Sequence, residues 1–229
     1  MHFHLPRPMH GWREFIGEVG IVVFGILIAL SAEQLVVASQ WRSEANHFRK
    51  AVDHELGRNL GLYGTVIANR PCVNRRIAEL ERFLADSRAG RQDRMLQPIG
   101  RPQTQSQYFS VWDNKGADVT AHLPQERRIG YGELYDEFRN NDVVRTSERD
   151  VWRSMAQFEL GEPLDHSDRM RLRELLTRAE QLNGVTPSNY TYILNLARPL
   201  GIQPIADPQT PYSPEKDPFC RPLLAPDGR

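Results

Sequence analysis

The sequence predicts an all-α protein with one N-terminal transmembrane helix, an extramembrane helical bundle and a Pro-rich extended C-terminal tail. Apolar residues recur at steps of three or four along most of the chain, which is the period of a helix. No segment alternates apolar and polar residues as a half-buried strand would. Half of the 16 prolines follow position 198, and proline fits neither a helix interior nor a central strand. We therefore expect a short cytoplasmic N-terminus (1–14), the transmembrane helix (15–39), an extracytoplasmic helical domain (40–200) and the tail (201–229).

Residues 15–39 carry the predicted span, with an apolar centre that runs from Val19 to Ala32. Trp12 and Trp41 bracket this segment at a separation of 29 positions, which is roughly 43 Å along a helix. A bilayer with its headgroup regions is about 40–45 Å thick, and Trp prefers the two headgroup regions. We therefore expect Trp12 and Trp41 to anchor the helix at the two membrane interfaces.

A cleavable signal peptide is the competing interpretation of the same segment. The tripeptide Ala-Leu-Ser at 29–31 has the small-x-small pattern of a weak cleavage site. However, the apolar run resumes after Gln34, over 35–38, whereas the mature end of a cleaved signal is usually polar. This continuation favours a retained anchor.

The orientation of the span rests on its flanking charges and on the cysteines. Arg7 and Arg13 precede the span, and Arg42, Arg49 and Lys50 follow it, so the positive-inside rule barely discriminates. An N-terminal segment this short usually stays inside, and two cysteines in the domain suit an oxidising exterior. Arginine far outnumbers lysine, which is typical of a GC-rich bacterial genome. We predict a bacterial inner (cytoplasmic) membrane protein with its N-terminus in the cytoplasm and the bulk of the chain in the periplasm.

Polar and small residues follow one face of the predicted span. Steps of about seven residues return to nearly the same angle on a helix, and Gly25 and Ala29 have the small-xxx-small spacing that lets a second helix approach closely. Carboxylates within a span generally face protein or a water-filled cavity rather than lipid. The alternative is that the two glutamates snorkel to the interfaces. We predict a partner-helix interface formed by Glu18, Val22, Gly25, Ala29, Ala32 and Glu33.

Within this segment, Gly17-Glu18 is followed by the run GILIAL at 25–30 and then by polar residues. This pattern resembles the N-terminal anchor of a family of uncharacterised bacterial single-span membrane proteins, whose domain is one of unknown function. The resemblance in sequence covers Trp12 to Arg42. The rest of the chain resembles the family only in the order of its segments, with one span followed by a domain. It implies a membrane anchor and no particular activity.

Beyond the span the helical period continues through the predicted domain. Arg70-Pro71 is expected to end or kink the first helix, and Asn183-Gly184 is expected to stop a later one. We therefore expect a stalk helix up to position 70, helices over 73–87, 108–123, 124–160, 165–183 and 186–201, and a polar surface loop over 88–107. These helices are expected to pack as an antiparallel bundle.

The two cysteines, Cys72 and Cys220, lie far apart in sequence and form no CxxC or CxxCH motif. This spacing disfavours zinc ribbons, thioredoxin chemistry and covalent haem. We predict that the two cysteines form one disulfide, which would join the tail to the start of the helix over 73–87. The alternative is two unrelated buried thiols.

Composition and motifs point away from several classes of function. Basic and acidic side chains balance at 29 each, so no nucleic-acid footprint is indicated. The sequence has no phosphate-binding loop, nucleophile elbow or HExxH helix. His47 and His54 lie seven apart on the stalk, too far for one metal ion, and aromatic residues at helical spacing suit a core better than a ligand pocket. We predict no catalytic residue, no cofactor, no metal site and no enzymatic activity.

Two functions stay open on these observations. The first is a non-enzymatic accessory or structural subunit of a bacterial inner-membrane protein complex, with an energy-transducing respiratory or photosynthetic complex as one host that fits. Its partners would be the lipid bilayer and other transmembrane subunits, with a hetero-complex favoured and a homo-oligomer as the alternative. The alternative is a membrane-tethered periplasmic ligand-binding or sensory helical bundle. That alternative lacks a cytoplasmic output domain, because only positions 1–14 precede the span.

Overall fold

The computed structural model describes residues 11–91, 94–103, 106–160, 163–206 and 212–225, so most of the predicted N-terminal segment lies outside the described ranges. The helices are α1 (Trp12–Arg88), α2 (Ser110–Asp113), α3 (Ala117–Ala121), α4 (Gln125–Met155), the 3₁₀ helix η1 (Ala156–Leu160), α5 (His166–Ala197), η2 (Arg198–Leu200) and η3 (Pro218–Cys220). Extended pairing within the described ranges is limited to one antiparallel bridge, between Met95 and Leu224. The predicted all-α fold is confirmed.

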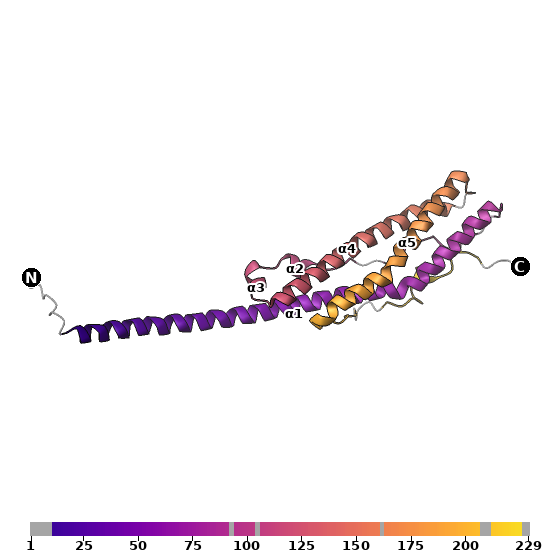
Figure 1. Cartoon of the computed structure of the whole chain (residues 1–229). Helices are drawn as coiled ribbons and strands as arrows, with labels where there is room; N and C mark the ends of the chain where they lie inside the picture. Colours follow the sequence, from indigo (N-terminus) through magenta and orange to yellow (C-terminus); the bar gives the residue numbers. More distant parts are fainter. Residues whose placement is uncertain (1–10, 92–93, 104–105, 161–162, 207–211, 226–229) are drawn as a thin grey trace, which may run out of the picture.

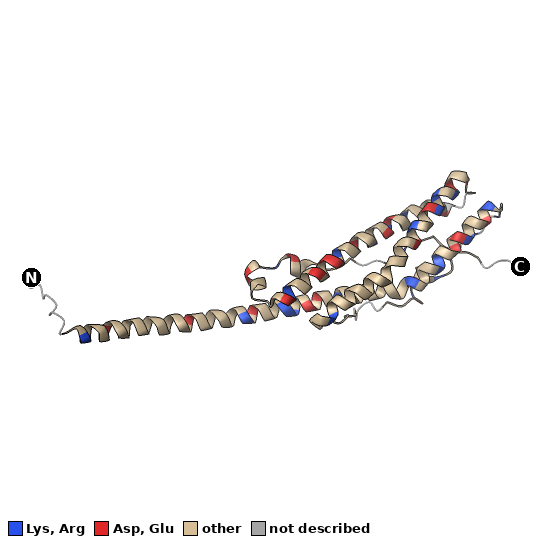
Figure 2. Cartoon of the chain, in the orientation of Figure 1, with Lys and Arg blue, Asp and Glu red and all other residues tan. Residues whose placement is uncertain are grey.

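The N-terminal part of α1 projects alone from a bundle that the rest of α1 forms with α4 and α5 (Figure 1). Burial along α1 begins at Ala45. Among the described helices only α1 is long and apolar enough to cross a membrane, a property that a signal sequence shares. Figure 2 shows the corresponding charge pattern: the projecting part carries few charges, whereas both signs are interspersed over the bundle.

α1 continues through Pro71, so this proline does not end the helix, and the separate helix predicted over 73–87 was wrong. A proline cannot donate to the carbonyl of Ile67, and its ring crowds that carbonyl, which bends a helix without always ending it. Cys72 and Val73 directly after it are buried in the core, and this packing carries the helix onward. Figure 1 shows α1 changing direction in its C-terminal part.

α5 likewise runs through Pro187, and the helix break predicted after Asn183 was wrong. The Asn183 side chain is buried and donates a hydrogen bond of 2.6 Å to Asn74 Oδ1 on α1, so tertiary contacts hold it inside the bundle. The predicted start of this helix is confirmed. Asp165 is the N-cap and forms a capping box with Asp168. The Asp165 carboxylate accepts from the Asp168 N–H, and the Asp168 carboxylate accepts from the Asp165 N–H.

The segments before α4 also differ from the prediction. The helix expected over 108–123 is two short helices, α2 and α3, with a turn between them. The segment over 88–107 is not merely a solvated loop, because Ile99 is fully buried in the bundle. α4 runs as one helix through Asn141, which is buried.

The bundle has two apolar cores with a buried polar layer between them. The proximal core, nearer the projecting part of α1, is built around Leu56, Leu60, Trp112, Tyr131, Tyr135, Phe138 and Ile193. The distal core is built around Leu80, Ile99, Trp152, Met155, Leu172, Leu176 and Phe219. Buried polar side chains at intermediate positions of the three helices are Asn69, Asn141, Arg145, Glu148, Asn183 and Thr186. The aromatic residues Trp112, Tyr131, Tyr135 and Trp152 are therefore packed within the cores.

Candidate functional site

The residues of the predicted partner-helix face all lie on the projecting part of α1. They are Glu18, Val22, Gly25, Ala29, Ala32 and Glu33, and all six are exposed. Because α1 is one continuous helix over this stretch, they lie along one side of it. The structure therefore places them together on a surface that the bundle does not bury.

Glycines distinguish the projecting part of α1 from the part inside the bundle. A Cβ added at Gly17, Gly20 or Gly25 would meet no other atom of the chain within 4 Å. A Cβ added at Gly61 would overlap the carbonyl oxygen of Ile205, so there the glycine makes room for the tail. Glycine in a helix costs about 1 kcal/mol relative to alanine. No contact within the described chain offsets that cost at Gly25.

The two predicted interface tryptophans have different surroundings. Trp12 is 74% exposed, and its ring lies 5.8 Å from that of Phe15. The half-buried Trp41 stacks on the imidazole of His122, with 4.6 Å between the ring centres and 6° between the planes. His122 Nδ1 lies 2.7 Å from the carbonyl oxygen of Asp118, and because a carbonyl only accepts, Nδ1 carries the proton. Trp41 is thus the point where the projecting helix meets the end of α3.

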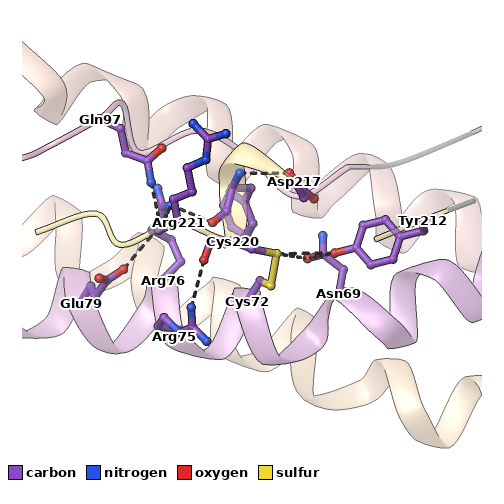
Figure 3. Close-up of a disulfide and its surroundings, with 11 residues drawn as sticks. Asn69, Cys72, Arg75, Arg76, Glu79, Gln97, Tyr212, Asp217, Cys220 and Arg221 are labelled. Carbon is purple, nitrogen blue, oxygen red and sulfur yellow. Dashed lines mark hydrogen bonds and ion pairs between the residues drawn. A yellow bond between two sulfur atoms is a disulfide. The ribbon is translucent and has the colours of Figure 1, made fainter. Parts of the chain in front are cut away.

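The predicted pairing of Cys72 with Cys220 is present as a disulfide that spans 148 positions of sequence (Figure 3). It fastens η3 to α1 directly after the proline of α1. The described parts of the tail pack on the bundle, where Leu223 and Leu224 are buried in the distal core. The tail residues 207–211 and 226–229 lie outside the described ranges.

The tail follows α1 in the same direction as the helix. It first meets α1 where the Ile205 N–H donates to the Gly57 carbonyl over 2.8 Å. Further along, Tyr212 donates to Asn69 Oδ1 over 2.7 Å. The last contact in the described tail joins Arg82 to the Ala225 carbonyl at 3.1 Å. The three contacts advance together along helix and tail, so the described tail residues 202–206 and 212–225, here called the strap, follow this part of α1.

Arg76, one turn after the disulfide on α1, is the main polar connection between the strap and the bundle (Figure 3). Its side chain is 1% exposed. Burial lowers the pKa of Arg76, and the nearby carboxylate of Glu79 opposes this effect. The guanidinium donates hydrogen bonds to the backbone carbonyls of Pro98, Ile99, Phe219 and Arg221. One side chain thus joins α1, the loop before α2 and the tail.

A buried ion pair lies in the polar layer, where Arg145 Nη1 and Glu148 Oε2 of α4 are 2.7 Å apart. Arg145 also donates to Thr186 Oγ1 over 2.6 Å, and the Tyr63 hydroxyl donates to the Thr186 carbonyl over 3.3 Å. Burial raises the pKa of Glu148, and the positive charge of Arg145 opposes this rise. Burial also raises the pKa of Tyr63, to about 12. The layer therefore ties all three long helices together just before Pro187.

A second polar cluster holds α2 on α1. Glu55 accepts a hydrogen bond of 2.6 Å from the Tyr135 hydroxyl, and its other oxygen accepts bonds from the first residues of α2. Burial and the hydrogen bond to Glu55 raise the pKa of Tyr135. One turn later, Asn59 pairs in both directions with the backbone of Tyr108. These groups serve the architecture, since each is engaged by another part of the chain.

A half-open cleft of about 320 Å³ lies between α1 and α5 near the end of α1. Its charged lining residues are Glu81, Arg88, Arg173 and Glu180. Partial burial is the main cause that raises the pKa of Glu81, and the neighbouring carboxyl of Glu180 raises this pKa further. Over the described ranges, no group of three or more His, Cys, Asp or Glu side chains is placed to hold a metal ion.

Fold and site together define a helical bundle with a projecting apolar helix and a disulfide-linked strap. The chain matches no protein-family model, no curated protein and no solved structure. The resemblance of residues 12–42 to the anchor of an uncharacterised single-span family stays a prediction from the sequence.

Proposed function

We propose that the protein is a non-enzymatic accessory subunit of a bacterial inner-membrane complex, held by one transmembrane helix with its N-terminus in the cytoplasm and its bundle in the periplasm. Gly25 carries this proposal, because it lies on an exposed helix face where an added Cβ would meet nothing in the described chain beyond the backbone of its own helix. Small residues in a span let another helix pack closely. A partner helix on this face would give Gly25 a packing role and would shield Glu18 and Glu33 from lipid.

The bundle supports a structural role in the periplasm. Its buried carboxylates Glu55 and Glu148 are hydrogen-bonded or ion-paired with groups of the same chain. The disulfide between Cys72 and Cys220 supports an oxidising compartment, because disulfides persist there and are rare in the cytosol. Both observations favour a structural role for the bundle, as a rigid module that covers a surface of its partner. They favour this role more than a catalytic one.

Purification of the tagged full-length protein in mild detergent tests the proposal. We expect stoichiometric partner chains to co-elute with the wild-type protein and to be lost from Gly25→Leu, because the added side chain fills the close-approach surface. The matched control is Gly20→Leu, which adds the same side chain on a different face of the helix. A wild-type protein that elutes as a monomer without partners would refute the accessory-subunit proposal.

A membrane-tethered ligand-binding bundle is the second candidate, and the charged cleft between α1 and α5 favours it. In that case the purified monomer would gain thermal stability with a small zwitterionic compound, and Arg173→Ala would abolish the gain. The control is Arg171→Ala, because Arg171 pairs with Glu174 and does not line the cleft. Absence of any stabilising compound in such a screen would leave the accessory subunit as the better account.

A further inference from the structure

The elements nearest the projecting helix are α3 and its flanking turns. α3 packs against α1, and His122 at its end stacks on Trp41. Leu123, the next residue, is buried in the proximal core, so the bundle holds this segment in place. In Figure 1 α3 is the part of the bundle closest to the projecting end of α1.

The depth of α3 in a membrane follows from this contact if α1 spans the bilayer as proposed. Trp12 and Trp41 are separated by roughly 43 Å of helix, which places Trp41 in the headgroup region when Trp12 lies in the opposite one. Two rings stacked 4.6 Å apart lie at nearly the same depth. His122 must therefore reach the same headgroup layer as Trp41.

The side chains around α3 suit a headgroup surface more than the hydrocarbon core. Its exposed residues are small or polar, namely Ala117, Asp118, Ala121 and His122, and Lys115 precedes them. The Lys115 ammonium has three N–H donors, of which one bonds the Trp112 carbonyl at 3.2 Å, so others can donate to phosphate oxygens. Large apolar residues that would insert deeply are absent from the exposed surface of α3.

We propose that α3 and its flanking turns, residues 114–124, rest on the phospholipid headgroups of the leaflet from which α1 emerges. The inference rests on the proposed membrane span. α1 continues without a break from the span into the bundle, so α3 supplies a second point of contact with the membrane beside the helix itself. Two contacts fix the tilt of the bundle over the bilayer, which a single helix leaves free.

Fluorescent labelling of the full-length protein in phosphatidylcholine vesicles tests the contact. Ala117→Cys places a probe on α3, and Ala156→Cys places the same probe at the far end of α4; both alanines are exposed. Labelling without reductant spares the two native cysteines, because they are bridged. Lipids that carry a nitroxide on the headgroup should quench the probe at position 117 severalfold more than the probe at 156. Ala121→Cys on the same helix should behave like Ala117→Cys.

The same sample separates the inference from the proposed span. Resistance of the protein to extraction at alkaline pH reports the span, and probe quenching reports α3. Extractable protein would overturn both proposals. Integrated protein with equally weak quenching at 117, 121 and 156 would overturn the headgroup contact alone. Equal strong quenching at all three positions would also overturn it, because the bundle would then lie flat on the membrane.

Discussion

The guanidinium of Arg76 donates a hydrogen bond of 2.8 Å to the backbone carbonyl of Phe219 and lies 4.8 Å from the centre of the Phe219 ring. The two residues are separated by 143 positions, so the strap supplies both the acceptor and the aromatic face for a cation on α1. A buried charge is tolerated only when it is paired and hydrogen-bonded. The strap therefore stabilises the buried charge of Arg76, and Arg76 in turn holds the strap on α1.

Arg76→Met should lower the free energy of unfolding by about 3–5 kcal/mol, because four backbone carbonyls, those of Ile99 and Phe219 in buried bonds, lose a charged donor. The neighbouring Arg75→Met should change it by less than about 0.5 kcal/mol, since Arg75 is exposed and, within the described residues, bonds the Cys220 carbonyl alone, at 2.9 Å. Urea unfolding of the full chain in detergent measures both. Equal losses in the two variants would contradict the role assigned to Arg76.

Cys72→Ser should lower the free energy of unfolding by up to about 5 kcal/mol in the chain-entropy model, because the disulfide closes a loop of 148 positions. Cys220→Ser and the double variant should lose the same amount, since either change opens the loop. Unfolding with and without reductant gives the comparison, and peptide mapping of non-reduced protein verifies the bridge. A wild-type protein with two free thiols would remove this effect and the support for a periplasmic bundle.

Most of the architecture could be predicted from local patterns. Apolar spacing predicts the helices, a cap at Asp165 or Ser167 predicts the start of α5, and the tail prolines predict an extended segment. The errors in helix ends at Pro71 and just before Pro187 share one cause. A proline removes one intrahelical hydrogen bond, and whether the helix continues depends on tertiary packing that the local sequence does not show.

The contacts of the strap were harder to predict than the helices. Arg76 is one of many arginines, and its acceptors come from segments 22 and 143 positions away, so no local pattern marks it. Gly57 and Gly61 did carry a signal, because two glycines four apart on a predicted helix make one face open to close approach. The partner of Trp41 could not be predicted from local sequence. His122 lies far from Trp41 in the chain, and the two rings meet only because α3 packs against α1.

Gly61→Ala should destabilise the protein by about 1–3 kcal/mol, because the new Cβ would overlap the Ile205 carbonyl and push the strap away. Gly184→Ala is the matched control in α5. A Cβ there meets no atom within 4 Å, so we expect it to stabilise the helix by up to about 1 kcal/mol. Thermal unfolding should shift in opposite directions in the two variants. A stabilised Gly61→Ala protein would show that the strap does not lie on this face of α1.

Glu81→Gln should stabilise the protein at neutral pH and leave it unchanged in acid. Partial burial and the carboxyl of Glu180 raise the folded-state pKa of Glu81 above its ordinary value of 4.5. A raised pKa means that the favourable contribution is complete below pH 4.5 and is lost as the pH rises through the folded-state pKa. At pH 7 the charged form of Glu81 is therefore disfavoured, first by its partial burial and then by the carboxyl of Glu180, and glutamine removes that charge.

Glu174→Gln on α5 is the matched control for this charge effect. Glu174 pairs with Arg171 at 2.8 Å on the surface, so its loss should cost up to about 0.5 kcal/mol at neutral pH. Glu81→Gln should instead gain up to about 1 kcal/mol, because an exposed like-charge contact is screened by solvent. Thermal unfolding at pH 4 and pH 7 measures both variants. A gain from Glu81→Gln that persisted unchanged at pH 4 would show that packing in the cleft, rather than repulsion from Glu180, sets its stability.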